Sequence, residues 1–492
     1  MKKITWVILS VIFWIPVSLK AQSDVDALRY SQTGVAGTAR FTSMGGAFGA
    51  LGGDFSSLSW NPAGIGIYRT SEFTFTPSLY IEQTKSDFQG NPSTANKYNF
   101  NLGDLGLVYT QKLGNDDNST GWKNWNFGIG YNRVNNFNTS SSYEGFNTKN
   151  SLLDNFLENI NSGSGTTADN LDPYYENLAY QTYLINPDTT NSSYYNSVIP
   201  AGGELQRRTS TTTGSLGELV LSFGGNYGNK LYLGATLGLS TLRYTEETTY
   251  EEVDKNDSIS DFNSFRFNQN VTTHGFGINL KLGMIYRIND WVRVGAAFHT
   301  PTFYSMTDDY NSTMSSTFDN GDNYSYDSPL GTYDYNLTTP MRAIGSVAFI
   351  INKMGLISAD YEFVDYSETR FDASDNSFFD VNNTIQQKYT ATGNLKLGTE
   401  WKYGNISFRG GYAMYGSPFA SAYRVSSADM SRNAYSLGIG IRDQGYFLDL
   451  SYVLTQGNEF YQPYSLNNFQ DVPGVTNKVT TNSISFTLGA KF

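Results

Sequence analysis

Residues that could carry chemistry are scarce in this 492-residue chain. It has no cysteine, and its only histidines are His274 and His299, about one strand length apart. It contains no G-x-S-x-G, no H-E-x-x-H and no phosphate-binding loop. The lack of cysteine excludes disulfides, thiolate nucleophiles and cysteine-ligated metals. We therefore predict no catalytic residue, no metal site and no cofactor, and we do not expect an enzyme.

The composition narrows the class of protein further. The chain has 33 basic and 45 acidic residues and a net charge of −12, which makes nucleic acid an unsuitable partner. Aromatic residues reach 15%, with 36 Tyr and 32 Phe, yet the mean hydropathy is −0.39. No apolar run after residue 20 is long enough to span a bilayer as a helix. This indicates either a water-soluble β-protein or a transmembrane β-barrel.

The N-terminus predicts a secretory signal peptide over residues 1–21. Lys2 and Lys3 form its charged region, residues 4–19 are apolar, and Ala21 precedes the expected cleavage site. An apolar run of this length is short for a membrane helix, which needs about 20 residues. We expect an exported protein whose mature chain begins at Gln22 and, given the barrel features below, a location in the Gram-negative outer membrane.

Alternating apolar and polar residues predict strands through most of the chain. Near the C-terminus, Ile484 and Phe486 flank Ser485, and successive side chains of a strand point to opposite faces. One face would meet lipid and the other the lumen. The charged residues Lys396 and Arg409 fall on the polar face, as do Glu400 and Asp449. The fourteen expected strands are 72–83, 98–112, 123–136, 214–226, 229–245, 270–288, 291–306, 334–351, 355–366, 388–403, 405–416, 432–443, 445–456 and 479–492.

The lengths of the connections distinguish a membrane barrel from a soluble sandwich. Links after even-numbered strands are mostly tight turns such as 227–229 and 289–290, whereas links after odd-numbered strands are long, above all 137–213. Short turns at one rim, long loops at the other and an even strand number are typical of bacterial outer-membrane barrels. The predicted fold is all-β: a transmembrane antiparallel β-barrel of about 14 strands over residues 72–492, with a long extracellular loop at 137–213.

A glycine-rich segment, 41–68, precedes the first expected strand and shows no strand alternation. Its apolar residues, among them Phe41, Met44 and Phe48, argue against a solvated tail. The lumen of a barrel with this many strands would be filled with water unless something plugged it. We therefore predict that residues 22–71 form an N-terminal hatch inside the barrel.

Two further features predict places where a ligand would act. In the long loop, one face of a predicted helix carries apolar residues: Leu152, Leu153, Phe156, Leu157 and Ile160. Apolar surface at an outer rim would receive a hydrophobic ligand, although these side chains would equally well pack together as a lid. His299 and Pro301 mark either a break in the wall or the end of a strand, because proline cannot donate to the sheet ladder.

Several short motifs give the chain a family resemblance. It resembles the FadL/TodX family of outer-membrane transporters for hydrophobic compounds, in particular members from Bacteroidetes that are often labelled hemin receptors. The motifs run in family order from hatch to C-terminus, so the resemblance covers nearly the whole mature chain. They are SMGGA at 43–47, DFSS at 54–57, WNPAG at 60–64, RVGAAFHTP at 293–301, TPMRAIG at 339–345, DYEFVDYS at 360–367 and RGGY at 409–412.

The resemblance implies passive transport of long-chain fatty acids or other hydrophobic compounds. The compound would bind in the lumen against the hatch and leave sideways into the membrane. A hydrophobic small molecule and outer-membrane lipid or lipopolysaccharide are the implied partners; protein partners are unknown. The hatch residues implied by the motifs are Gly45, Gly46, Asp54, Trp60, Asn61, Pro62 and Gly64.

Two other functions fit the same resemblance. Relatives of this barrel in Bacteroidetes act as scaffold or shuttle components of type IX secretion, and others are described as hemin uptake receptors. Apolar loop helices favour a small ligand, whereas flat polar loops favour protein docking, and this chain has both. Two histidines and no cysteine argue against a dedicated haem site.

Overall fold

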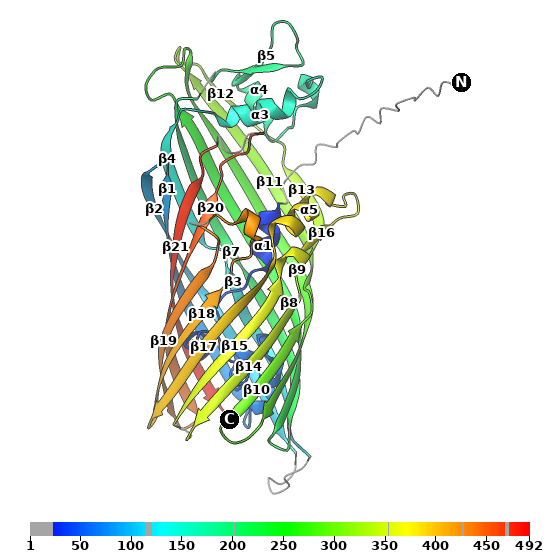
Figure 1. Ribbon diagram of the computed structural model, residues 1–492, viewed down its shortest axis with the longest axis vertical. Helices are drawn as coiled ribbons and strands as arrows, with labels where there is room; N and C mark the ends of the chain where they lie inside the picture. Colours follow the sequence, from blue (N-terminus) through cyan, green and yellow to red (C-terminus); the bar gives the residue numbers. More distant parts are fainter. Residues whose placement is uncertain (1–22, 114–120, 200–201, 353, 426–427, 468–471) are drawn as a thin grey trace, which may run out of the picture.

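The wall of the molecule is a closed antiparallel β-barrel (Figure 1). The computed structural model describes residues 23–113, 121–199, 202–352, 354–425, 428–467 and 472–492. The wall closes where the first strand pairs with the last, Glu72 opposite Lys491. Fourteen strand positions make up the circuit, so the predicted fold class is confirmed. The expected signal peptide, residues 1–21, lies outside the described residues.

Several wall positions are formed by two strand pieces in succession. In order around the barrel the strands are β1 (Glu72–Phe88), β2 (Asn91–Lys112), β3 (Trp122–Asn136) with β4 (Thr139–Asn147), β7 (Glu204–Tyr227), β8 (Leu231–Val253), β9 (Phe262–Arg287), β10 (Val292–His299) with β11 (Phe303–Phe318), β13 (Gly331–Thr338) with β14 (Arg342–Ile351), β15 (Gly355–Asp365), β17 (Ala391–Tyr403), β18 (Ile406–Tyr415), β19 (Arg432–Asp443), β20 (Tyr446–Tyr461) and β21 (Val475–Lys491).

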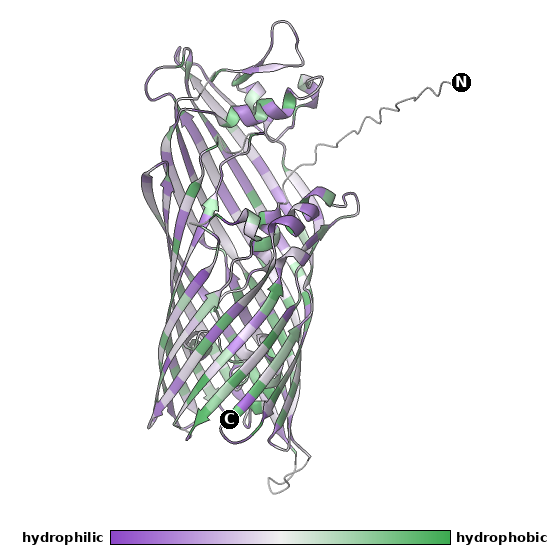
Figure 2. Ribbon diagram, in the orientation of Figure 1, coloured by the Kyte–Doolittle hydropathy of each residue, from purple (hydrophilic) through white to green (hydrophobic). Residues whose placement is uncertain are grey.

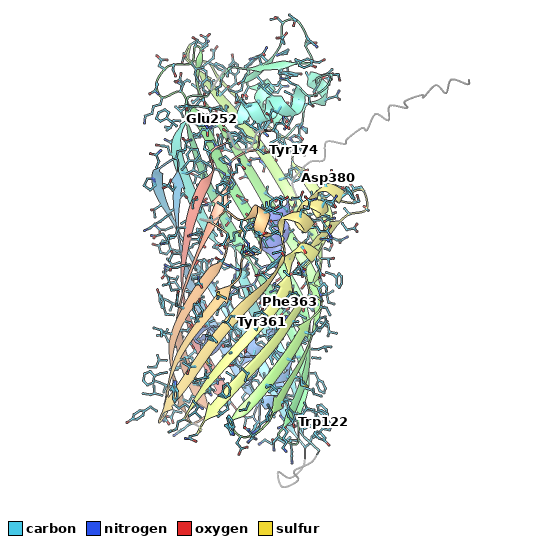
Figure 3. The ribbon with its side chains drawn as sticks, in the orientation of Figure 1. Trp122, Tyr174, Glu252, Tyr361, Phe363 and Asp380 are labelled. Carbon is cyan, nitrogen blue, oxygen red and sulfur yellow. The ribbon has the colours of Figure 1, made fainter. Side chains whose placement is uncertain are left out.

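The outer face of the barrel carries an apolar belt. Ile484 and Phe486 of β21 are exposed while Ser485 between them is buried, as the alternation predicted. On β15, Tyr361 and Phe363 are likewise exposed, and Trp122 lies at the lower rim (Figure 3). Figure 2 shows apolar residues gathered toward the lower half of the wall and polar residues toward its upper end. An outward apolar belt around a polar interior is the pattern of a barrel that spans a membrane.

Among the residues that the structure describes, no helix is long and apolar enough to cross a membrane.

Several strands are longer than the sequence pattern indicated. β7 begins at Glu204 rather than near residue 214, and β8 continues to Val253 rather than ending near 245. These upper parts lie beyond the apolar belt, where both faces of a strand can be polar, as in the threonine-rich stretch 209–213. Hydrophobic periodicity therefore does not reveal them.

Short elements cover the upper end of the barrel. The cap, defined here as residues 148–199, contains α3 (Leu152–Ile160), η3 (Ala168–Asn170), α4 (Glu176–Gln181), β5 (Ile185–Pro187) and β6 (Tyr195–Ser197), and it sits above the wall (Figure 1). Two short strands extend the sheet at this end: β12 (Asn323–Asp327) pairs with β11, and β16 (Arg370–Asp372) pairs with β13. The remaining elements outside the wall are η4 (Tyr366–Glu368), α5 (Phe379–Lys388) and η5 (Ser421–Tyr423).

The N-terminal elements lie within the wall. They are α1 (Asp24–Ser31), α2 (Ala39–Ser43), η1 (Phe55–Ser59) and η2 (Pro62–Ile67). α2 packs against β18 to β21, and η2 packs against β3, β7, β8 and β9, so opposite sides of the barrel touch this segment. Phe48, Phe55 and Leu58 are fully buried between them. We call residues 23–71 the hatch.

Candidate functional site

Local capping fixes the shape of the hatch. Asn61 begins η2: its Oδ1 accepts a hydrogen bond from Ala63 N at 3.1 Å, and Pro62 occupies the first turn. Its Nδ2 donates to Gly49 O at 2.6 Å and to Met284 O of β9 at 3.3 Å. Asn61 therefore joins two turns of the hatch to the wall.

Asp54 plays the corresponding part for η1. Its Oδ1 accepts hydrogen bonds from Ser56 N at 3.1 Å and from Thr38 Oγ1 at 2.7 Å. Thr38 caps α2, so one carboxylate holds α2 and η1 together.

Glycine is required where the hatch touches the wall most closely. Gly45 and Gly46 have φ values of 63° and 75°, in the left-handed region. A Cβ on Gly45 would lie 3.0 Å from the backbone of Tyr412 in β18, and one on Gly64 would lie 2.6 Å from Ser57 Oγ. Any side chain at these positions would push the hatch away from its neighbours.

Trp60 joins the hatch to three wall strands. Its Nε1 donates to Asp360 Oδ2 of β15 at 2.7 Å, and its carbonyl accepts from His299 Nε2 of β10 at 2.9 Å. The ammonium of Lys396 on β17 lies over the indole, 3.2 Å from the ring centroid. One residue of the hatch thus contacts a carboxylate and an ammonium of the wall through its side chain and an imidazole through its carbonyl.

A buried ion network holds the lower part of the hatch. Arg40 of α2 binds Glu400 of β17 at 2.8 Å, Arg409 of β18 binds the same carboxylate at 2.7 Å, and Arg409 also binds Asp449 at 2.6 Å. The sequence placed the three wall residues on the lumen face but gave no sign of Arg40 as their partner. The alternation of side chains along a strand assigns a residue to the lumen face of the wall, but it does not indicate which hatch residue that side chain will contact.

A cavity of about 110 Å³ lies between the hatch and the wall. Tyr30, Phe41 and Trp60 line it from the hatch, and Leu216 and Tyr304 from the wall. Its charged lining side chains are four cations, Arg133, Lys281, Arg342 and Lys396, and two carboxylates, Glu218 and Glu362. The cavity is therefore partly apolar and has more positive than negative charges.

The two carboxylates are already paired. Lys281 binds Glu218 at 2.5 Å, and Arg342 binds Glu362 at 2.7 Å. Lys396 is only 2% exposed, and among the described contacts its ammonium has the Trp60 ring as its close neighbour but forms no hydrogen bond or ion pair. A buried ammonium beside a cavity, without an anion at bonding distance, can accept an anion from a ligand.

The wall is incompletely paired at one edge of the cavity. β2 and β3 pair only up to Asp104 opposite Asn132, and over the described residues no ladder joins 93–103 of β2 to 133–142 of β3 and β4. We call this stretch the seam. Three side-chain hydrogen bonds cross it. Arg133 Nε donates to Leu102 O at 3.0 Å, Asn136 Nδ2 donates to Asn99 Oδ1 at 3.3 Å, and at its upper end Ser93 Oγ donates to Ser142 O.

Along part of the seam, the hatch replaces β2 as the hydrogen-bond partner of β3. Gly34 N donates to Val134 O at 3.0 Å, and Asn135 Nδ2 donates to Gln32 O at 3.1 Å. Outside, beside the seam, Tyr98 and Phe100 of β2 are 67% and 77% exposed. Since Arg133 and Val134 also line the cavity, the seam separates the cavity from the outer face of the barrel.

The strand is also interrupted at Pro301, and hydrogen bonds bridge the interruption. β10 ends at His299 and β11 begins at Phe303. Across the gap, Thr339 N donates to Thr302 O at 3.1 Å and Thr300 N donates to Leu280 O at 3.0 Å. The strand is interrupted here while its neighbours stay bonded on both sides.

The predicted loop helix forms, as α3, and faces inward. Leu152, Leu153, Phe156 and Ile160 are buried in the core of the cap, together with Phe265 and other residues from the tops of the strands. Leu157 is only partly buried, and with Leu466 it lines an open groove beside α3. The apolar face therefore holds the cap together, and Leu157 is its accessible member.

The two histidines do not converge. His299 lies buried against Trp60, whereas His274 is exposed on the outer face of β9 opposite Arg243. Within the described part of the chain, no cluster of His, Cys, Asp or Glu has the arrangement of a metal site.

Fold and site together define a plugged barrel of the outer-membrane type, with a charged cavity between plug and wall. No protein-family model and no curated protein sequence matches the chain. Among solved structures, a FadL homologue from Pseudomonas aeruginosa is similar, with a TM-score of 0.54 and 15% identity over 94% of this chain and 98% of that one.

Two toluene transporters are similar to the same degree. TodX of Pseudomonas putida has a TM-score of 0.51 and 12% identity over 94% of this chain and 99% of its own. TbuX of Ralstonia pickettii has a TM-score of 0.51 and 14% identity over 93% and 99%. The fold is that of the FadL and TodX barrels, so the resemblance drawn from the sequence motifs is confirmed at the level of the fold.

Proposed function

We propose that the protein is a passive outer-membrane transporter for amphiphiles that join a carboxylate to an apolar chain, as long-chain fatty acids do. The observation that carries this proposal is the unpaired ammonium of Lys396 beside a partly apolar cavity. The similar structures include transporters of toluene, a neutral hydrocarbon. We therefore infer the charge of the ligand from the side chains that line the cavity of this protein.

The charge of the cavity favours an anion. Its lining has four cationic side chains and two carboxylates, although the whole chain carries a net charge of −12. A carboxylate bound near Lys396 would compensate one of the excess positive charges in a place that water reaches poorly. A neutral hydrocarbon would fill the apolar part and, among the described residues, leave the ammonium with only the carboxylates of Glu362 and Asp360, neither of them at bonding distance.

The size of the cavity limits how much of the ligand it holds. Its volume of about 110 Å³ is well below the roughly 300–1,000 Å³ of most ligand pockets. It therefore accommodates the carboxylate and the first few carbons. The rest of an acyl chain would extend toward the seam, where Val134 lines the cavity and Phe100 is exposed to lipid.

Release through the seam requires less disruption than release past the hatch. At the base, Arg40, Glu400 and Arg409 form buried ion pairs, and removing one partner of such a pair costs about 3–5 kcal/mol. The seam is crossed by side-chain hydrogen bonds, each contributing about 0.5–1.5 kcal/mol. These contacts support lateral release into the membrane between β2 and β3.

Ligand entrance is proposed at the cap. Leu157 and Leu466 offer apolar surface in the open groove beside α3, where a hydrophobic molecule would first bind. The buried side chains Leu153 and Phe156 would meet the ligand only after the cap has opened.

Uptake into liposomes tests the ligand class. We would compare radiolabelled oleate with toluene, using the native protein, Lys396→Met and, as a control on the outer face, Lys85→Met. We expect Lys396→Met to lower oleate uptake about tenfold or more, since a hydrogen bond to a charged group contributes about 1.5–3 kcal/mol, and to leave toluene uptake unchanged.

The other outcomes of this assay identify the alternatives. Equal loss for both compounds would show that Lys396 only supports the hatch, and toluene uptake alone would assign a neutral substrate. A folded barrel that takes up neither compound would favour the scaffold of a secretion system. Saturable binding of hemin would favour the hemin receptor instead.

A further inference from the structure

The first turn of α3 in the cap is held by a carboxylate from the wall. Glu252, at the top of β8, accepts hydrogen bonds from Ser151 Oγ at 2.6 Å and from Leu152 N at 2.8 Å. It also accepts from Tyr250 Oη at 2.7 Å and from Gln206 Nε2 at 3.0 Å. Figure 3 shows Glu252 where the wall meets the cap. This one side chain fastens the start of the helix to the barrel.

A second carboxyl lies next to it without a partner. Glu204 of β7 is 0% exposed, and among the described contacts neither of its carboxyl oxygens has a hydrogen-bond partner. Gln206 stands directly opposite Glu252 in the ladder, and Glu204 lies two residues along the same face. Glu204 and Glu252 are therefore diagonal neighbours, a separation across which charges interact.

Over the residues that the structure describes, no cation pairs with either carboxyl. The other titratable groups that act on this pair are acids and tyrosines: Asp154 of α3, Asp254 after β8, Tyr250 of β8, Tyr143 of β4 and Tyr464. Arg208, further along β7, is engaged with Glu246 at 3.3 Å and lies over the ring of Tyr461. Two ionised carboxylates at this place would repel each other in a poorly solvated pocket.

The pKa values of both groups follow from this arrangement. Burial, and then the charge of Glu252, raise the pKa of Glu204 to about 8. Burial raises the pKa of Glu252 to about 7, despite its hydrogen bonds. A carboxyl whose pKa is higher in the closed cap than in water stabilises the closed form at low pH. That stabilisation is lost as the pH rises through these values.

We propose that Glu204 and Glu252 form a proton-dependent latch. The latch keeps the cap docked on the barrel while one of the two carboxyls is protonated, and it releases the cap when both carboxyls are ionised. The neutral group relieves the repulsion, so the ionised one can serve as the acceptor for Ser151 and Leu152. When the last proton leaves to the solvent, repulsion weakens these bonds and α3 separates from β8. This movement does not depend on the proposed transport function; only its effect on uptake does.

A distance measurement tests the latch directly. Because the chain has no cysteine, spin labels can be attached at Ser164→Cys in the cap and Thr213→Cys on β7 without competing thiols. Both positions are exposed. We expect a single narrow distance distribution at pH 5.5 in the native background, and a broader, longer one at pH 9.

Two variants separate the latch from general loosening. Glu204→Gln keeps the shape of the neutral group and should hold the distribution narrow at pH 9. Glu247→Gln, on the exposed face of β8, should behave as the native protein. The latch is wrong if the native distribution is the same at both pH values, or if Glu204→Gln opens at pH 9 as the native protein does. The native titration needs no variant, so a folding defect in Glu204→Gln would still leave a decisive result.

Discussion

The indole of Trp60 in the hatch lies beneath the ammonium of Lys396 in the wall, with Nζ 3.2 Å from the ring centroid. The same indole donates its Nε1 hydrogen to Asp360 at 2.7 Å. Trp60 thus holds the hatch against the wall and at the same time orients Lys396, a cavity cation with no anion at bonding distance among the described residues.

Replacing Trp60 with phenylalanine should separate these two roles. Trp60→Phe keeps a ring beneath Lys396 but removes one of the two donors to the buried carboxylate of Asp360 and leaves only Gly49 N, which costs about 1–3 kcal/mol. We expect the purified barrel to lose its heat-modifiable gel mobility at a lower temperature than the native protein. Trp122→Phe, at the lower rim, serves as the control. An unchanged transition for Trp60→Phe would show that the hydrogen bond to Asp360 does not stabilise the hatch.

The ion network at the base of the hatch should keep the barrel closed to ions. Glu400→Gln leaves the guanidiniums of Arg40 and Arg409 buried without their shared carboxylate, at a cost of about 3–5 kcal/mol. We expect planar bilayers containing this variant to show frequent channel openings that the native protein lacks. Glu247→Gln provides the matched control on the outer face. Conductance equal to the native level would mean that apolar packing alone holds the plug.

A covalent link across the seam should block transport. Asn99→Cys with Asn136→Cys places two thiols where the native side chains meet at 3.3 Å. Oxidation should abolish most oleate uptake, and a reductant should restore it. The control pair, Thr245→Cys with Thr272→Cys, links β8 and β9, which are already paired at that level. Full uptake by the oxidised seam variant would exclude release between β2 and β3.

Gly45 allows a matched comparison between two glycines. Gly45→Ala adds a Cβ at a φ of 63° and 3.0 Å from the backbone of Tyr412, where left-handed geometry alone costs about 1–2 kcal/mol. Gly345→Ala in β14 adds the same atom with no heavy atom within 4 Å. We expect only Gly45→Ala to lower the thermal stability of the barrel. Equal midpoints would show that the hatch adjusts at this contact without loss.

Much of the fold could be predicted because a membrane wall imposes strict periodicity. Lipid requires apolar residues on one face, so the parity of Ile484 and Phe486 already specified which side of β21 faces outward. The upper parts of β7 and β8 were missed because water surrounds both of their faces. The turn lengths gave the orientation of the barrel for a related reason, since the two rims face different compartments.

The site was harder to predict because its parts meet only in the folded barrel. The motifs identified Trp60 and Asn61 as hatch residues, but nothing in the sequence connects Trp60 with Lys396, 336 positions later (396 − 60). The face of α3 was predicted correctly as apolar, yet periodicity does not say whether such a face meets a ligand or a core. The seam depends on where two strands stop pairing, and side-chain alternation on β2 continues past that point.

The length of β7 has a consequence for the surroundings of the protein. It contains 24 residues, whereas a tilted strand crosses the bilayer with about 9–11. Roughly 13 residues at about 3.3 Å each, inclined by about 40°, leave on the order of 30 Å of wall above the lipid. The mouth of the barrel therefore lies well above the apolar belt. Under the proposed transport function, a hydrophobic molecule that enters at this mouth would cover the distance to the lipid inside the wall and not in open water.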